Sequence, residues 1–317
     1  MNHSFRFVVL ALLALAAPLT AEDVIRLGHF PNITHAQALV ASQLSRQGRG
    51  WFETMIPGLK IQWFAYNAGP SAMEAIFAGS IDATYAGPNP VLNAYSRSRG
   101  EEVRVLAGAA AGGAALVVQS DGRIKTPADF KGRRLATPQL GNTQDVAARA
   151  WLKKQGFHIT QLGGDVLVLP TANPDQLALF KQKKLDAVWT VEPWVTRLEL
   201  EAGGKVFLEE PGALVTVLAS SVKFLRSKPD LARRFVAAHV ALTKWISEYP
   251  ADAQALVRAE LLEQTKRDFP AETAEQAWKR LKFTAEVRRE QFDALVGEAQ
   301  SVGFLKDAAP LDRLLVR

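Results

Sequence analysis

The chain has 317 residues, of which 48% are hydrophobic and 22% charged, and this ordinary globular composition belongs to a chain too long for one compact core. Two domains are therefore expected. The 38 basic and 32 acidic residues leave a formal charge of +6, spread in short clusters such as KGRR and KQKK. Without a concentrated basic stripe or a nucleic-acid module motif, this excess argues against nucleic-acid binding.

The first residues have the layout of a cleavable secretory signal. Arg6 lies in a short polar start, and an apolar run too short to span a bilayer extends from Phe7 to Ala17. We expect residues 1–21 to be the signal peptide, with cleavage after Ala21; an uncleaved anchor is the alternative. Because the chain has no cysteine, it offers no disulfide and no thiol for a lipid anchor. The bacterial periplasm is the expected location.

Apolar alternation in residues 23–30 predicts a first strand, followed by a loop and a helix that ends near Gly48. Residues 59–67 predict a second strand, 68–79 a helix and 81–87 a third strand. This βαβαβ alternation predicts a parallel sheet covered by helices.

The same order of elements recurs from residue 132. Strands are predicted at 132–138, 164–170 and 185–190, with a first helix capped by Asn142 or Thr143 and a second at 173–184. The motifs IDATY and LDAVW end the two halves in the same way. Their aspartates, Asp82 and Asp186, are expected to bond backbone N–H groups rather than act in acid–base chemistry. The chain therefore reads as two lobes of one architecture.

Two further strands connect these lobes in the predicted organisation. One runs through Val118 and the other covers 214–220, so the chain would cross between the lobes twice and form a hinge. We expect residues 22–117 and 222–317 to form lobe I and residues 118–221 to form lobe II. The mostly helical segment after Lys228 is expected to pack on lobe I.

The loops at the carboxyl ends of the predicted strands are rich in Gly, Asn, Thr, Ser and Gln, and four of them begin helices. Ligands of open parallel sheets bind at this edge, and helix N-termini suit a small anion. Ordinary helix capping is the alternative for any single residue. Tyr85 and Trp189 are expected on the wall of a cleft, whereas Trp194 is equally compatible with wall or core.

Motifs of common enzymes are missing from the sequence. No dinucleotide or P-loop fingerprint occurs, and GPSAM has Met73 where a nucleophile elbow needs glycine. His29 and His35 flank the first loop without a third metal ligand nearby, so neither a metal nor a cofactor is expected. His35 could instead donate a hydrogen bond to an anion.

Four ordered segments carry a resemblance to a known family: RLGHFPNITHAQALVA, FAGSIDATYAGPNP, TPADFKGRRLATPQLGNTQD and LDAVWTVEPW. Together they resemble the periplasmic substrate-binding proteins of ABC importers for nitrate, aliphatic sulfonates and taurine, over about residues 23 to 225. The resemblance implies an α/β type II periplasmic binding protein, with two lobes joined by a two-strand hinge and a helical C-terminal segment. It also implies a monomer that presents one ligand to a membrane permease with its cytoplasmic ATPase.

The resemblance places ligand contacts at the ends of corresponding strands. In lobe I they fall on Asn32, Ile33, Thr34, His35, Asn67, Ala68, Gly69, Ser71, Ala86, Gly87 and Asn89. In lobe II they fall on Gly141, Asn142, Thr143, Gln144, Trp189, Glu192 and Trp194. Because a carboxylate repels an anion, either Glu192 points away, or the ligand carries an amine as taurine does.

Other functions of the superfamily remain as alternatives. A binder of thiamine pyrimidine precursors or another small heterocycle fits the same loops, and so does a periplasmic sensor domain that works without a transporter. An enzyme branch with this fold resembles the chain less, because that branch depends on a cysteine-rich motif and this sequence has no cysteine.

Overall fold

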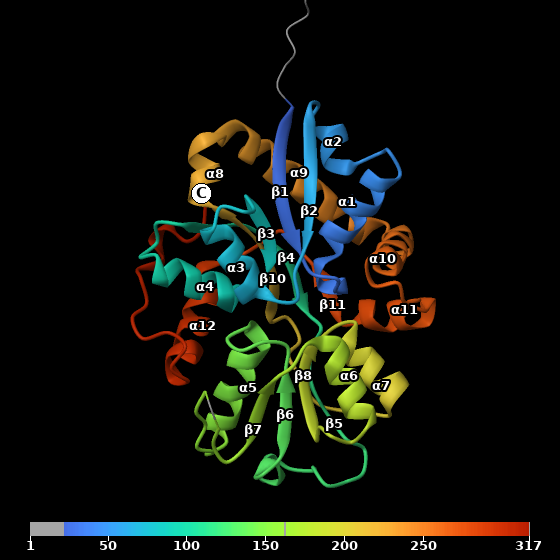
Figure 1. Ribbon diagram of the computed structural model, residues 1–317, viewed down its shortest axis with the longest axis vertical. Helices are drawn as coiled ribbons and strands as arrows, with labels where there is room; N and C mark the ends of the chain where they lie inside the picture. The colour runs from blue at the N-terminus through green and yellow to red at the C-terminus, as the bar shows by residue number, and fades with distance from the viewer. Residues whose placement is uncertain (1–21, 162, 317) are drawn as a thin grey trace, which may run out of the picture.

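The computed structural model describes residues 22–161 and 163–316, which form two α/β lobes placed one above the other in Figure 1. The predicted signal segment, residues 1–21, lies outside the described residues. Lobe I contains a six-stranded sheet in the order β11-β4-β10-β3-β1-β2, and lobe II a five-stranded sheet in the order β7-β6-β8-β5-β9. The structure therefore has the two-lobed α/β organisation that the repeated sequence pattern predicts.

Lobe I is built from both ends of the described chain. Its strands are β1 (Asp23–His29), β2 (Leu59–Ala65), β3 (Ala83–Ala86), β4 (Val103–Gly112), β10 (Leu214–Ser221) and β11 (Leu281–Phe283). Its N-terminal helices are η1 (Ile33–His35), α1 (Ala36–Arg46), α2 (Trp51–Met55), α3 (Gly69–Phe77) and α4 (Pro88–Arg97). The C-terminal ones are α8 (Val222–Ser227), α9 (Pro229–Glu248), α10 (Pro250–Thr265), α11 (Ala271–Lys279), α12 (Arg289–Ser301) and η3 (Leu311–Arg313).

Lobe II is formed by the middle of the chain. Its strands are β5 (Ala114–Val118), β6 (Arg134–Thr137), β7 (Leu167–Pro170), β8 (Ala187–Val191) and β9 (Lys205–Glu209). Its helices are η2 (Pro127–Phe130), α5 (Thr143–Lys154), α6 (Asn173–Lys181) and α7 (Trp194–Ala202).

The two lobes repeat one arrangement of strands. In lobe I the parallel strands lie in the order β2-β1-β3, and in lobe II in the order β7-β6-β8. Each third strand then pairs with an antiparallel strand, β10 or β5. The carboxyl ends of the parallel strands therefore face the space between the lobes (Figure 1).

The two repeated aspartates have the same structural role in both lobes. Asp82 accepts from the backbone N–H of Arg26 at 2.8 Å and from its guanidinium at 2.7 Å. Asp186 accepts from the backbone N–H of Arg134 at 2.9 Å and from its Nε at 3.0 Å. Each carboxylate thus ties the start of a third strand to the neighbouring first strand, which confirms the predicted backbone-bonding role.

The chain crosses between the lobes at two short segments. Strand β4 belongs to lobe I and β5 to lobe II, and between them Gly112 and Gly113 adopt φ values of +75° and +73°. This left-handed backbone favours glycine, so the pair turns one long extended segment from the first sheet into the second. The return crossing is residues 210–213, between β9 and β10. The sheets thus divide the chain earlier than the predicted limits of 117/118 and 221/222: nearly all of β5 was predicted in lobe I, and the whole of β10 in lobe II.

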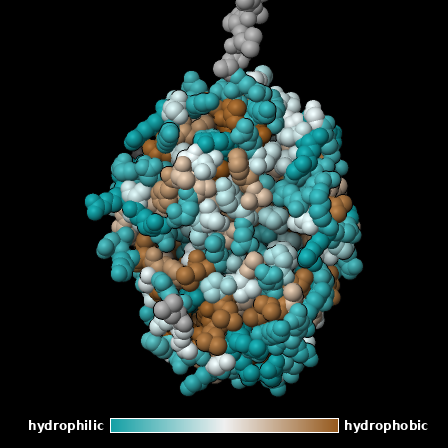
Figure 2. Space-filling view, viewed as in Figure 1, coloured by the Kyte–Doolittle hydropathy of each residue, from teal (hydrophilic) through white to brown (hydrophobic). Residues whose placement is uncertain are grey.

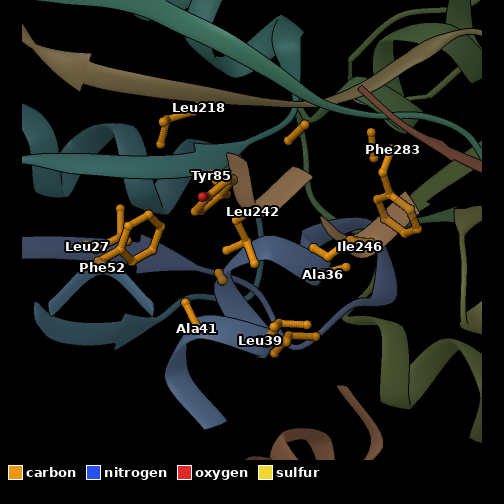
Figure 3. Close-up of a cluster of buried hydrophobic side chains, with 14 of the residues drawn as sticks. Leu27, Ala36, Leu39, Ala41, Phe52, Tyr85, Leu218, Leu242, Ile246 and Phe283 are labelled. Atoms are coloured by element: carbon orange, nitrogen blue, oxygen red, sulfur yellow. The ribbon is translucent and has the colours of Figure 1, made fainter. Parts of the chain in front are cut away.

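Each sheet is covered on both faces by helices that close separate hydrophobic cores. In lobe I one core lies between the sheet and helices α1, α9 and α10, with Leu27, Phe52, Tyr85, Leu242 and other buried residues (Figure 3). The opposite face packs against α3, α4 and α12. Full burial of one such Leu or Phe side chain stabilises the fold by roughly 1.5–3 kcal/mol.

The C-terminal segment completes lobe I and also reaches lobe II. Strand β11 adds an edge to the first sheet, and α10 packs on α1. Helix α12, however, contacts both α4 of lobe I and α5 of lobe II, and α11 contacts α7.

The described surface is mostly hydrophilic on the face shown in Figure 2, with hydrophobic residues gathered mainly on the lower lobe. Within residues 22–161 and 163–316, the helices are all too short or too polar to cross a membrane.

Candidate functional site

A small space lies between the lobes at the carboxyl ends of the parallel strands; we call it the inner cavity. Its volume is about 30 Å³. Its lining comes from both lobes: Phe30, Asn32, Thr34, His35, Asn67, Ala68, Gly69, Gly87, Pro90 and Val215 from lobe I, and Pro138, Asn142, Thr143, Gln144, Asn173 and Val191 from lobe II. Among these described lining residues there is no Lys, Arg, Asp or Glu.

The loop after β1 provides the lobe I wall through Asn32, Thr34 and His35, all buried. His35 Nδ1 accepts from the backbone N–H of Phe30 at 3.3 Å. Burial lowers the pKa of His35 well below its usual value, so the ring is neutral at pH 7 and carries its proton on Nε2. His35 can therefore act as an uncharged hydrogen-bond donor.

The other lobe I contributions come from the ends of β2 and β3. Asn67 and Gly69 lie at the start of α3, and Gly87 precedes α4. The backbone N–H groups of Gly69 and Gly87 belong to the starts of these two helices, where donors lack partners within the helix.

Lobe II faces this wall with the start of α5. Asn142 is the N-cap, and its side-chain oxygen accepts from the backbone N–H of Asp145 at 2.9 Å. Its Nδ2 donates to Gln144 Oε1 at 3.0 Å, which fixes both amides at the cavity wall. Asp145 itself is fully buried and bonds Thr137 and Arg149, so its charge is compensated within lobe II.

Asn173 is a lining residue that sequence reasoning did not select. It is the first residue of α6, is 4% exposed, and its Oδ1 accepts from Thr190 Oγ1 at 3.1 Å. It follows the end of β7 as Asn67 follows the end of β2. The equivalent positions of Asn67 and Asn173 in the two repeats could have identified Asn173 as a lining residue from the sequence.

Two aromatic residues expected on the cleft wall point into the cores instead. Tyr85 is fully buried and its hydroxyl lies 2.9 Å from His239 Nδ1. Trp189 is 1% exposed, and its Nε1 donates to Glu210 Oε2 at 3.3 Å. Ala86 is also a core residue. Because these strands are buried on both faces, their side chains have no solvent-facing side, and the prediction that Tyr85 and Trp189 lie on the cleft wall was wrong.

Three further predicted residues lie near the inner cavity without lining it. The Ser71 hydroxyl donates to the backbone carbonyl of Ala68 at 2.8 Å, within the first turn of α3. Asn89 and Gly141 line a separate space of about 10 Å³ beside Phe304. Both polar atoms of the Asn89 side chain are buried without a hydrogen-bond partner among the described residues.

Glu192 does not face the inner cavity. Its side chain is fully buried and accepts from Thr196 Oγ1 at 2.8 Å and from the Arg280 guanidinium at 3.0 Å. Burial raises the pKa of Glu192, and the Thr196 hydrogen bonds and the Arg280 charge offset part of this effect. The first of the two alternatives for Glu192, that it points away from the ligand, therefore describes the structure.

Arg280 connects the lobes beside the hinge. It lies between α11 and β11 of lobe I, and its partners are all in lobe II: Glu192 at 3.0 Å, Glu199 at 2.9 Å and Glu209 at 2.9 Å. The lobes also touch directly across the cleft, because Trp194 Nε1 donates to Asn32 Oδ1 at 2.9 Å. The structure is thus a closed arrangement of the two lobes.

The inner cavity combines neutral donors with helix starts. The starts of α3, α5 and α6 all contribute lining residues, and each helix directs the positive end of its dipole to its N-terminus. Such an environment favours a negative group without a formal counter-charge. Chemically, the site is built for hydrogen bonding to one small polar or anionic group.

Comparison with known sequences places the chain in a family. The profile of the NMT1-like family matches residues 20–262. The chain belongs to the NMT1-like family.

Two relatives of this NMT1-like chain come from Escherichia coli K12. A protein named for the binding of aliphatic sulfonates is 28% identical over 158 residues, covering 49% of this chain and 47% of the relative. The taurine-binding periplasmic protein is 28% identical over 152 residues, covering 48% and 45%. The matched part thus spans about half the length of these curated relatives.

The fold also matches solved structures. The alkanesulfonate-binding protein SsuA from Xanthomonas axonopodis pv. citri, bound to MOPS, superposes with a TM-score of 0.72 at 22% identity, covering 92% of this chain and 96% of that one. This likeness shows that the NMT1-like chain has the periplasmic binding protein fold predicted from its sequence.

Proposed function

We propose that this chain is the solute-binding component of an ABC importer, working in the periplasm as a monomer. It holds an organic sulfonate or a similar monoanion between its lobes and delivers it to a membrane permease with its ATPase. The single observation that carries the proposal is the inner cavity: both lobes line it, with amides, hydroxyls, a neutral histidine and helix starts. No covalent step is part of this function.

The charge of the lining argues for a monoanion. A phosphate dianion is usually held by Arg or Lys, and the described lining has neither. A sulfonate keeps a single negative charge over the whole physiological pH range, so it needs hydrogen bonds more than counter-charges. The described lining of the inner cavity offers no carboxylate to the amine of taurine, and Glu192 is bound to Arg280 and Thr196. Alkyl sulfonates are therefore favoured over taurine.

The relatives support the same class of ligand. One is named for aliphatic sulfonates and the other for taurine, and the second is named as periplasmic. The expected signal peptide agrees with export of this chain.

Calorimetric titration of the chain from residue 22 onward tests the proposal. Methanesulfonate, taurine, nitrate and phosphate are compared, with a melting curve for each. Methanesulfonate at 100 times its Kd should add about 2.7 kcal/mol to the free energy of unfolding. Absence of binding by every sulfonate, or tightest binding of phosphate, would contradict the proposal.

A matched pair of variants in helix α5 locates the site. Gln144→Ala removes a lining amide and should weaken methanesulfonate binding by about tenfold or more, because hydrogen bonds to charged groups contribute about 1.5–3 kcal/mol. Gln155→Ala changes the same residue type at the exposed end of the helix and should leave affinity unchanged. Equal affinities of both variants would remove the site assignment.

A further inference from the structure

We propose that a second, larger space beside the inner cavity holds the hydrocarbon or ring body of the ligand, so that the chain selects sulfonates with an extended apolar substituent. This inference rests on the proposed function. The space, called the outer cavity, measures about 320 Å³ against about 30 Å³ for the inner cavity. An inorganic anion would leave it unused.

The two cavities are continuous through shared residues. Asn32, Asn67 and Asn173 line both of them. A ligand whose head group is held by these amides in the inner cavity can therefore extend its body past them into the outer cavity.

The outer cavity offers mainly apolar walls, and they come from both lobes. Leu261 and Phe269 of lobe I lie at the end of α10 and in the loop after it, and Pro193 and Trp194 of lobe II lie at the start of α7. The charged Arg267 and Asp268 are exposed residues. Because both lobes contribute, an apolar body buried here favours the closed arrangement in addition to the head group.

The Trp194 ring is held in a fixed position at this wall. Its Nε1 donates to Asn32 Oδ1 at 2.9 Å, and the Arg197 guanidinium lies 4.8 Å from the ring centroid. Arg197 in turn is bound to Glu201, which compensates its charge. Trp194 therefore provides a rigid aromatic surface at the junction of the two cavities.

A competing route for the ligand body exists on the other side of the inner cavity. A space of about 240 Å³, called the rear cavity, shares Thr143, Gln144 and Val215 with the inner cavity. Its lining includes two carboxylates, Glu210 and Glu298, at the end of the hinge and on α12. Carboxylates near an anionic ligand cost free energy. Glu210 and Glu298 are half-buried, whereas Asp268 of the outer cavity is exposed next to Arg267, so the outer cavity is the favoured side for an apolar body.

A homologous series of ligands tests the inference on the full chain from residue 22 onward. Calorimetric affinities are measured for methane-, propane-, butane- and benzenesulfonate. Each methylene buried in the outer cavity should improve the affinity about fourfold, which corresponds to about 0.8 kcal/mol per CH₂. Equal affinities of methanesulfonate and butanesulfonate would overturn this inference and leave the proposed function standing. Failure of the whole series to bind would overturn both.

Two matched variants distinguish the routes. Thr265→Trp places a large side chain in the outer cavity from an exposed position, and Ala294→Trp does the same in the rear cavity. Thr265→Trp should abolish the increase in affinity with alkyl chain length but keep the affinity for methanesulfonate. Ala294→Trp should leave the affinities of the whole sulfonate series unchanged. The reverse pattern would place the ligand body in the rear cavity and overturn the inference. Melting curves check that both variants fold.

Discussion

Replacement of Arg280 by Met tests the contact between the lobes beside the hinge. The guanidinium side chain is 24% exposed and pairs with three carboxylates of lobe II, of which Glu192 is fully buried. Removing one partner of a buried ion pair costs about 3–5 kcal/mol, because the remaining charge is left without compensation. Since Arg280 is partly exposed, we expect the free energy of unfolding to fall by about 3 kcal/mol at pH 7. The more exposed Glu199 and Glu209 add less than about 1 kcal/mol each.

The loss should depend on pH in a defined direction. Burial raises the pKa of Glu192 above its usual value of 4.5, and Arg280 counteracts this rise. Without Arg280 the pKa rises further, so the native variant keeps a proton that the unfolded chain has released. Its free energy of unfolding then falls as the pH rises from about 4.5 through the native pKa. The difference in unfolding free energy between Arg280→Met and the wild type should therefore be small near pH 4 and reach its full value at pH 7.

Urea unfolding followed by circular dichroism at pH 4 and pH 7 measures both effects. Arg289→Met is the control, because Arg289 also pairs with two carboxylates, Asp293 and Asp312, but at the surface. The control should lose less than about 1 kcal/mol at either pH. Equal losses in Arg280→Met and Arg289→Met, or a loss in Arg280→Met that does not change with pH, would refute this account of Arg280.

Variants at three further positions separate ligand binding from stability. Gly87→Ala would place a Cβ 2.4 Å from Thr143 Oγ1 across the cleft, so titration should show weaker ligand binding at an unchanged melting temperature; unaltered affinity would contradict this. Asn142→Ala removes the cap of α5 and should cost about 1 kcal/mol of unfolding free energy, whereas Asn142→Ser should retain most of it in the same urea assay. Tyr85→Phe should lower the unfolding free energy by about 1 kcal/mol through loss of the His239 bond, with ligand affinity unchanged, and a binding defect would return Tyr85 to the site.

Much of the fold could be predicted from the spacing of apolar residues. The three strands and two helices predicted for each repeat occur, because apolar segments bounded by capping or breaking residues mark them in the sequence. Strand β11 has only three residues, Leu281–Phe283, too few for any period to show. The division of one extended segment at Gly112 and Gly113 also had no periodic signal, since both strands beside it are buried.

The candidate site was predictable to the extent that it follows from topology. Asn32, Asn67 and Asn142 come together because parallel strands end at one edge of each sheet. The side chains of Tyr85 and Trp189 were not predictable in the same way. They lie within strands of doubly buried sheets, where both faces are apolar and the sequence shows no alternation. Glu192 was ambiguous because its partner Arg280 is distant in the chain.

The duplication suggests a physical reason why a neutral site would hold the anion that we propose as its ligand. Each repeat alone supplies helix starts on one wall of the site. On a wall open to water, the helix dipoles attract an anion only weakly, because water screens them. In the closed arrangement the start of α3 lies opposite those of α5 and α6 around the inner cavity. The closed contacts Trp194 to Asn32 and Asn89 to Thr143 form between the lobes themselves. A ligand therefore shifts the equilibrium toward the closed form only through contacts that it makes with both lobes at once. In our proposal the head group makes such contacts in the inner cavity, and an apolar body adds more of them in the outer cavity.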